Sequence, residues 1–256
     1  MAPFKFSVVR IVLLALLLGG CTAGPGYKLH YTLKDDPKSR PIKSAVLLPV
    51  DVDVSEMSLG GIVEEVPEWS EQAENNVRKA VLFVRDPDEN KVFVRQVDSS
   101  SLEPDEQKKL EEHLALFTVV ASNALWTELP GNSAWQFKQE HFDYTIGDGM
   151  RFLKDKYDID AGLIVVGEDV ISSSGRKTAA VVGAIFGVGL PMGYTVLVGG
   201  LVDFRTGDIL WLNHVVQTGS LDLRDAEDAR NFARSLMSGY PGLPEQKLVV
   251  VSGEDG

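Results

Sequence analysis

The chain has 256 residues, 44% of them hydrophobic and 24% charged, a composition that excludes a collagen-like chain, a disordered chain and a multi-span membrane protein. The formal net charge of −12 argues against nucleic acid as a partner, because an acidic surface repels phosphate. A single cysteine excludes an intramolecular disulfide and a cysteine-rich zinc site.

Residues 1–20 have the pattern of a secretory signal peptide. Two cations precede the apolar segment 11–18, which is shorter than the roughly 20 residues of a membrane-spanning helix. The sequence LGGC of residues 18–21 then resembles a bacterial lipobox and contains the only cysteine. The resemblance implies cleavage between Gly20 and Cys21 and a lipid anchor on the Cys21 thiol. The alternative is an ordinary signal peptide, with Cys21 as an incidental residue of the mature chain.

The residues after Cys21 suggest where the mature chain is held. Cleavage would remove Lys5 and Arg10 and no acid, so the formal net charge would become −14. Thr22 stands where an aspartate retains enterobacterial lipoproteins at the inner membrane, so we expect the periplasmic face of the outer membrane. Residues 21–42 contain three prolines, two glycines and no sustained periodicity, which predicts a lipidated tether.

The first part of the main domain, predicted over residues 43–240, alternates strands and helices. The apolar run 45–50 predicts a strand buried on both faces, and the alternation of Asp51 and Asp53 with valines predicts that this strand leaves the core. A second strand is predicted within 57–66. Helix-start signals at 67–71 precede apolar residues at helical spacing. Residues 91–97 alternate as a strand.

The longest predicted helix opens at Ser101 and Pro104, and its apolar second half is expected to pack in the core. The later elements are a short helix, a buried strand, two strands joined by a tight turn, and a last helix capped by Asp222. These elements occupy residues 146–157, 161–167, 194–204, 209–218 and 222–237, with the turn at 205–208. Residues 241–256 are predicted to be a flexible tail.

The order of elements predicts a single α/β domain with a mixed sheet, a C-terminal antiparallel hairpin and helices packed on the sheet. Three stretches also resemble the group of the curli-secretion lipoprotein and the TolB amino-terminal domain. They are SAVLLP at 44–49, DAGLIVVG at 160–167 and GLVDFRTGDILW at 200–211. The resemblance implies an envelope lipoprotein with an assembly or export role. It implies no functional residue, because the matched positions belong to strands and turns.

Residues 178–202 carry no charge and are rich in glycine. The favoured interpretation is a short buried helix or apolar loop over 178–190, because Pro191 and six glycines weaken a membrane-spanning helix. The alternative is an element that binds a partner or inserts into a membrane, since an exposed apolar segment of this size implies oligomerisation or insertion. The spacing of Gly187 and Gly189 does not match a dinucleotide-binding loop, because Met192 stands where the third glycine belongs.

No catalytic or metal-binding constellation is recognised in the sequence. The four histidines lack metal-ligand spacing, and the serines at 172–174 lack a nucleophile-elbow frame. Arg176 and Lys177 after them are expected at a loop tip. The acid pairs Asp51/Asp53 and Glu64/Glu65 are expected to be solvated, and the four tryptophans to be core or rim anchors.

We therefore expect a non-enzymatic, lipid-anchored envelope protein that acts as an interaction or assembly module. We expect no cofactor, no bound metal and no nucleic acid, and a protein partner or homo-oligomer besides the membrane. The alternative is a periplasmic hydrolase or ligand-binding protein whose site assembles from residues distant in sequence.

Overall fold

The computed structural model describes residues 26–36, 38–83, 95–97, 101–127, 136–187, 189–219 and 221–241. The strands are β1 (Lys28–Leu29), β2 (Ala45–Leu47), β3 (Asp51–Met57), β4 (Val63–Glu65), β5 (Arg95–Gln96), β6 (Ala161–Ser172), β7 (Tyr194–Asp203) and β8 (Ile209–Thr218). The helices are α2 (Tyr31–Asp35), α3 (Pro67–Phe83), α4 (Pro104–Thr127), α5 (Gln136–Glu140), α6 (Arg151–Tyr157), α7 (Ser174–Ile185) and α8 (Ala226–Leu236), with a 3-10 helix at Asp148–Met150.

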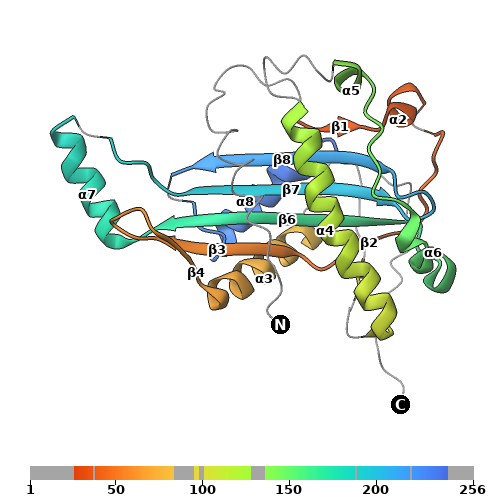
Figure 1. Ribbon diagram of the computed structural model, residues 1–256, viewed down its shortest axis with the longest axis horizontal. Helices are drawn as coiled ribbons and strands as arrows, with labels where there is room; N and C mark the ends of the chain where they lie inside the picture. The colour runs from red at the N-terminus through yellow and green to blue at the C-terminus, as the bar shows by residue number, and fades with distance from the viewer. Residues whose placement is uncertain are drawn as a thin grey trace.

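The described strands form one mixed sheet around β6 (Figure 1). The order is β1-β8-β7-β6-β2-β5, and β3 continues along β6 beyond β2 with β4 outside it. Strands β2 and β3 run parallel to β6, whereas β7 runs antiparallel to it. The predicted α/β fold with a mixed sheet is therefore confirmed.

The predicted C-terminal hairpin is also confirmed as the antiparallel pair β7 and β8. Its turn requires a glycine, because Gly207 has a φ of +75° and a Cβ there would lie 1.8 Å from the carbonyl oxygen of Gly147. The backbone amide of Gly207 donates to the carbonyl of Asp203 at 2.7 Å. The glycine that the sequence places in this turn is thus the residue that the turn geometry requires.

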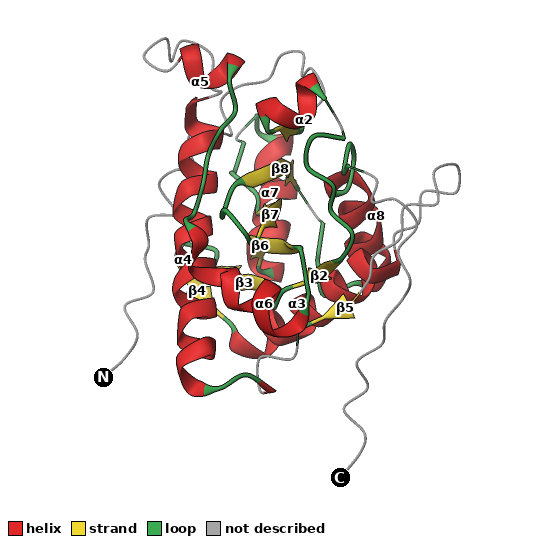
Figure 2. Cartoon of the chain, turned by 90° about the vertical axis from the view of Figure 1, so that its right-hand side faces the viewer, coloured by secondary structure: helices red, strands yellow, loops and turns green. Residues whose placement is uncertain are grey.

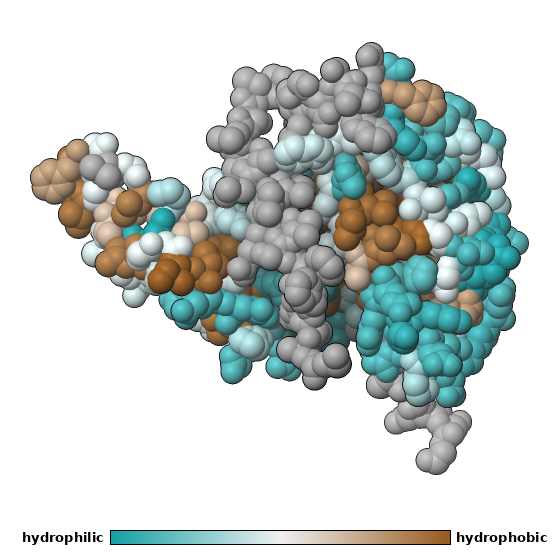
Figure 3. Space-filling view, in the orientation of Figure 1, coloured by the Kyte–Doolittle hydropathy of each residue, from teal (hydrophilic) through white to brown (hydrophobic). Residues whose placement is uncertain are grey.

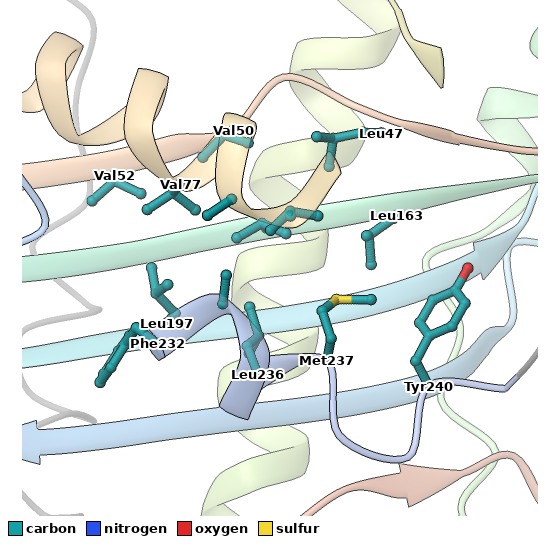
Figure 4. Close-up of a cluster of buried hydrophobic side chains, with 14 of the residues drawn as sticks. Leu47, Val50, Val52, Val77, Leu163, Leu197, Phe232, Leu236, Met237 and Tyr240 are labelled. Atoms are coloured by element: carbon teal, nitrogen blue, oxygen red, sulfur yellow. The ribbon is translucent and has the colours of Figure 1, made fainter. Parts of the chain in front are cut away.

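Helices cover both faces of the sheet, which makes three layers (Figure 2). Helices α3 and α8 lie on one face, where Val77, Phe232 and Leu236 pack against the apolar side chains of β3, β6 and β7 (Figure 4). Helix α4 covers the other face through Leu110 and Phe117. Each face of β6 is therefore buried, which explains its nearly continuous apolar sequence.

The chain from Asp51 to Glu65 differs from the prediction. Asp51 and Asp53 do not mark the departure of a strand from the core; they are the exposed positions of β3, whose Val52 and Val54 are buried. The predicted second strand over 57–66 is replaced by the end of β3, a turn and β4, which form an antiparallel hairpin. The alternation of acids with valines is therefore that of a strand with one face buried and the other exposed.

The predicted tether over 21–42 also differs from the structure in its described part. β1 pairs antiparallel with β8, and α2 follows it directly. Leu33 and Ile42 are buried in the core. The prolines and glycines of this segment therefore accompany short elements that cover one edge of the sheet, and the described residues from 26 onward are part of the domain.

Two helix predictions need correction. The helix over 104–127 is confirmed, but its second half is not buried on all sides, because Leu116, Val119 and Trp126 are exposed. The last helix is capped by Asp225, whose carboxylate accepts from the amides of Glu227 and Asp228. Asp222 instead pairs with Arg224.

Candidate interaction surface

The most unusual surface of the described chain is helix α7. Val181, Val182, Ile185 and the following residue Phe186 are large apolar side chains that are 50–77% exposed. They occupy positions i, i+1, i+4 and i+5, which share one side of a helix. We call these four residues the apolar face of α7. Figure 3 shows this apolar surface along the part of the molecule that projects from the domain.

Helix α7 stands away from the sheet, with its first turn at the end of β6 and its C-terminal end free (Figure 1). Every described residue from 181 to 187 is exposed except the half-buried Gly183. A helix of a globular protein normally turns its apolar stripe toward the core. In α7 that stripe is exposed instead, so the prediction of a buried segment over 178–190 is wrong.

The first turn of α7 is fixed by its N-cap, Ser173. The Ser173 hydroxyl oxygen accepts from the backbone amide of Arg176 at 3.3 Å, and the Ser173 amide donates to the carbonyl of Met57 at 2.9 Å. The cap therefore joins the helix to the end of β3. The three serines at 172–174 form the junction of β6 with α7, so Arg176 and Lys177 lie in the helix and not at the predicted loop tip.

Arg176 links the base of α7 to two other segments. Its side chain is only 6% exposed, although it carries a full charge. Nε donates to the carbonyl of Pro191 at 2.9 Å, and Nη1 donates to the carbonyls of Ser58 and Leu59 at 3.3 and 3.2 Å. A buried guanidinium needs such acceptors, since leaving its N–H groups without partners is costly. Arg176 therefore holds the base of α7 in place.

The turn bound by Arg176 also presents apolar side chains to solvent. Leu59 and Ile62, between β3 and β4, are 59% and 64% exposed. Together with the apolar face of α7 they account for six of the ten exposed large hydrophobic residues in the described parts of the chain. The exposed apolar surface is therefore concentrated at one end of the molecule.

The chain that follows the base of α7 carries no charge. Lys177 at the base of α7 is followed by no charged residue until Asp203 at the end of β7. After Thr178, α7 consists only of apolar residues and glycine, and Ala179, Ala180 and Gly183 are half-buried. This part of α7 thus has no polar face of the kind that makes an isolated surface helix soluble.

A second polar cluster ties the loop before α8 to the sheet. Asp169 of β6 is fully buried, and its carboxylate accepts from the Thr195 hydroxyl and from the Leu223 amide, both at 2.8 Å. Burial raises the pKa of Asp169 to about 6, although these two hydrogen bonds act in the opposite direction. Arg224 stacks on Trp69 at 3.8 Å from the ring centroid. This cluster is a structural link between α8, α3 and the sheet.

The remaining predicted site residues lie at separate places. Cys21 and Gly20, the proposed lipid-anchor and cleavage residues, lie outside the described residues, as does Trp135. His113 is half-buried, and its Nδ1 atom lies 2.8 Å from the carbonyl oxygen of Lys109. Trp211 is buried in the core, as expected.

Within the described ranges, no three His, Cys, Asp or Glu side chains are grouped closely enough to hold a metal ion. None of the described helices combines the length and the apolarity needed to cross a bilayer.

Comparisons with known proteins give only a distant structural likeness. No family pattern matches the sequence, and no curated protein matches it. The chain is similar to a solved PelC dodecamer from Paraburkholderia phytofirmans, with a TM-score of 0.32 and 10% identity over 80% of this chain and 89% of that one. A dodecamer of a PelC substitution variant from the same organism gives the same score and identity over 78% and 91%. A likeness at this score does not establish a shared function.

Proposed function

We propose that this chain is a lipid-anchored bacterial envelope protein that acts as a non-enzymatic interaction or assembly module, with the apolar face of α7 as its contact surface. The observation that carries the proposal is the exposure of four large apolar side chains on the part of α7 after Thr178, which contains no polar side chain. Exposed apolar surface of this kind marks an interaction site.

The base of α7 supports this role. Ser173 and the buried Arg176 connect the helix to β3, to the β3–β4 turn and to the segment before β7. These contacts fix the direction of a helix that has little packing along its length. A contact surface that is held in one orientation loses less conformational entropy when it binds.

The sequence supports the anchor. The lipobox-like LGGC would place an acyl-modified thiol five residues before Gly26, where the described domain starts. We propose that Cys21 holds the domain at the periplasmic face of the outer membrane. A lipid-modified cysteine carrying several acyl chains is a stable anchor, since two chains or signals already suffice.

The anchor is tested in cells that produce the full chain. Mass spectrometry of the N-terminal peptide is expected to show Cys21 with acyl mass, and Cys21→Ser is expected to leave the membrane fraction. An unmodified thiol, or a Cys21→Ser variant that still fractionates with membranes as the wild type does, would contradict this part of the proposal.

The contact surface is tested by a photo-crosslinking residue at position 185. An adduct, with lipid or with protein, is expected from position 185 and not from position 227, which is an exposed glutamate on α8. Equal adduct yields from both positions, or none from 185, would remove α7 as the contact surface. Turnover of ester, peptide or glycoside substrates by the purified chain would favour the hydrolase alternative.

A further inference from the structure

The contact that α7 makes can be specified further, on the assumption that the proposed lipid anchor at Cys21 exists. We infer that the free end of α7 inserts into the bilayer surface as a second attachment point. The occupant of the apolar face is then lipid, and neither a groove of another protein nor a second copy of this chain.

The distribution of exposure around α7 favours a bilayer. The apolar face covers one side of the helix, and Ala184 and Gly187 are exposed beside it. A flat protein surface would cover only one side of such a helix end, whereas a bilayer surrounds whatever enters it. The end of α7 from 181 to 187 carries no polar side chain on any side, and such a helical segment is normally buried on all sides.

The dimensions of α7 suit partial insertion. The exposed end from Val181 to Gly187 rises about 9 Å at 1.5 Å per residue. Interfacial helices typically bury their apolar parts by roughly 5–10 Å. The whole helix has 12 residues, about 18 Å, which is too short for a hydrocarbon core of about 30 Å. Lys177, exposed at the base, would lie at the level of the lipid headgroups.

The end of α7 also satisfies most of its own backbone. The Phe186 amide donates to the carbonyl of Gly183 at 2.9 Å, and the Gly187 amide donates to the carbonyl of Ala184 at 3.1 Å. These bonds close the last turn, so fewer polar groups would enter the lipid without a partner. Backbone polar groups in contact with hydrocarbon require such internal partners.

The proposed anchor brings a bilayer within reach. Cys21 precedes Gly26 by five residues, which span at most about 17 Å. β1 starts two residues after Gly26 and pairs with β8. In Figure 1 the C-terminal end of α7 is directed toward the side of the sheet on which β8 and β1 lie, at the opposite end of the strands from α2. The short distance from Cys21 to the domain would therefore keep α7 near the same membrane.

Charge explains why the contact would be apolar and not electrostatic. The mature chain would carry a formal net charge of −14, which repels an anionic membrane surface. Residues 178–202 are without charge, so the end of α7 adds nothing to that repulsion. Binding through this end is therefore expected to change little with salt concentration, unlike binding through a basic patch.

The experiment uses the mature chain with Cys21→Ser, which removes the lipid and the only native thiol. Cysteine is then introduced by Ile185→Cys and, as a matched control on α8, by Ser235→Cys, and each thiol is labelled with an environment-sensitive fluorophore. The probe is a vesicle of phosphatidylethanolamine and phosphatidylcholine, with or without spin-labelled acyl chains. The label at 185 is expected to gain intensity and to be quenched by the spin-labelled chains, whereas the label at 235 is not.

A second pair of variants tests the side chain itself. Phe186→Asp is expected to weaken vesicle binding about tenfold or more, and Phe186→Leu by only a few-fold. No response of the label at 185 to vesicles would overturn the inference. A label that is already shielded in a dimer without lipid would overturn it in favour of a second copy. If a protein adduct forms at 185 in cells while vesicles have no effect, the inference fails and the proposed function stands.

Discussion

Helices α7 and α8 are nearly equal in length, with 12 and 11 residues, and each begins at a side-chain N-cap. Their apolar residues lie in opposite environments. In α8 the side chains of Ala229, Phe232, Ala233 and Leu236 are buried against the sheet. In α7 the large apolar side chains are exposed, and only Arg176 is buried. The sheet accounts for the amphipathic pattern of α8, whereas the apolar face of α7 has no use within the described chain.

Phenylalanine occurs in both regions and gives the sharpest comparison. Phe232→Ala is expected to lower the free energy of unfolding by about 3–5 kcal/mol, because Phe232 is 2% exposed and its removal leaves a cavity. Phe186→Ala is expected to change it by less than about 0.5 kcal/mol, because Phe186 is 77% exposed. Urea unfolding of the mature Cys21→Ser chain measures both. Similar losses for the two variants would mean that α7 packs as α8 does.

The free energy of unfolding is expected to depend on pH through Asp169, which links the loop before α8 to the sheet. Burial raises the pKa of Asp169 to about 6 from an ordinary value of 3.8, so the folded state holds this proton at pH values where the unfolded chain has lost it. The stability contributed by the shift is present below about pH 4 and is lost as the pH rises through about 6. Relative to Asp169→Asn, the wild type is expected to lose about 2–3 kcal/mol between pH 4 and pH 7.

Unfolding curves across this range test the pH effect, with Asp148→Asn as a control at an exposed carboxylate. Other carboxylates titrate equally in both proteins, so the difference isolates Asp169. If the wild type gained stability relative to Asp169→Asn as the pH rises, the pKa of Asp169 would be lowered by folding and not raised, which would contradict this prediction.

The base of α7 is expected to depend on Arg176. Arg176→Met keeps much of the side-chain length but removes the donors to Pro191, Ser58 and Leu59, and should lower the free energy of unfolding by about 1–3 kcal/mol. Hydrogen exchange in residues 177–187 should become faster, because the helix loses its attachment. Lys177→Met, at the exposed neighbour, is the control and should change neither quantity.

The two N-caps give the smallest effect. Asp225→Ala removes the acceptor for the first amides of α8 and is expected to lower global stability by about 1 kcal/mol. Ser173→Ala removes the corresponding acceptor in α7, but this helix has little packing to keep it folded. Ser173→Ala should therefore speed hydrogen exchange over residues 174–187 and lower the free energy of global unfolding by less than Asp225→Ala does. A larger loss of global stability in Ser173→Ala than in Asp225→Ala would show that α7 is packed as tightly as α8, against this account.

The sequence predicted correctly those features that depend only on neighbouring residues in the chain. The β7–β8 hairpin followed from its turn residues and alternating strands, and the helix over 104–127 from its length and cap signals. Burial was harder, because periodicity identifies an apolar side but not what covers it. The exposed positions of β3 were mistaken for a strand leaving the core, and Leu116 and Val119 for core residues.

The candidate surface illustrates the same point. The absence of charge over 178–202 singled out the right segment, and exposure was the alternative to the favoured buried helix. The sequence could not decide between them, because Pro191 and the glycines are compatible with both. Nor did the sequence indicate that Arg176 is buried, since its partners are carbonyls at Ser58, Leu59 and Pro191. Backbone acceptors leave no sequence signal.

The most direct measurement is the accessibility of position 185 in intact envelopes. In the full chain the Cys21 thiol would be blocked by acylation, so Ile185→Cys and Ser235→Cys each offer one reactive thiol to a maleimide too large to enter lipid. We expect Cys introduced at 185 to be protected in the envelope and reactive in the purified Cys21→Ser mature chain, while Cys introduced at 235 reacts in both. Equal reactivity at 185 in the two settings would show that nothing covers the apolar face of α7.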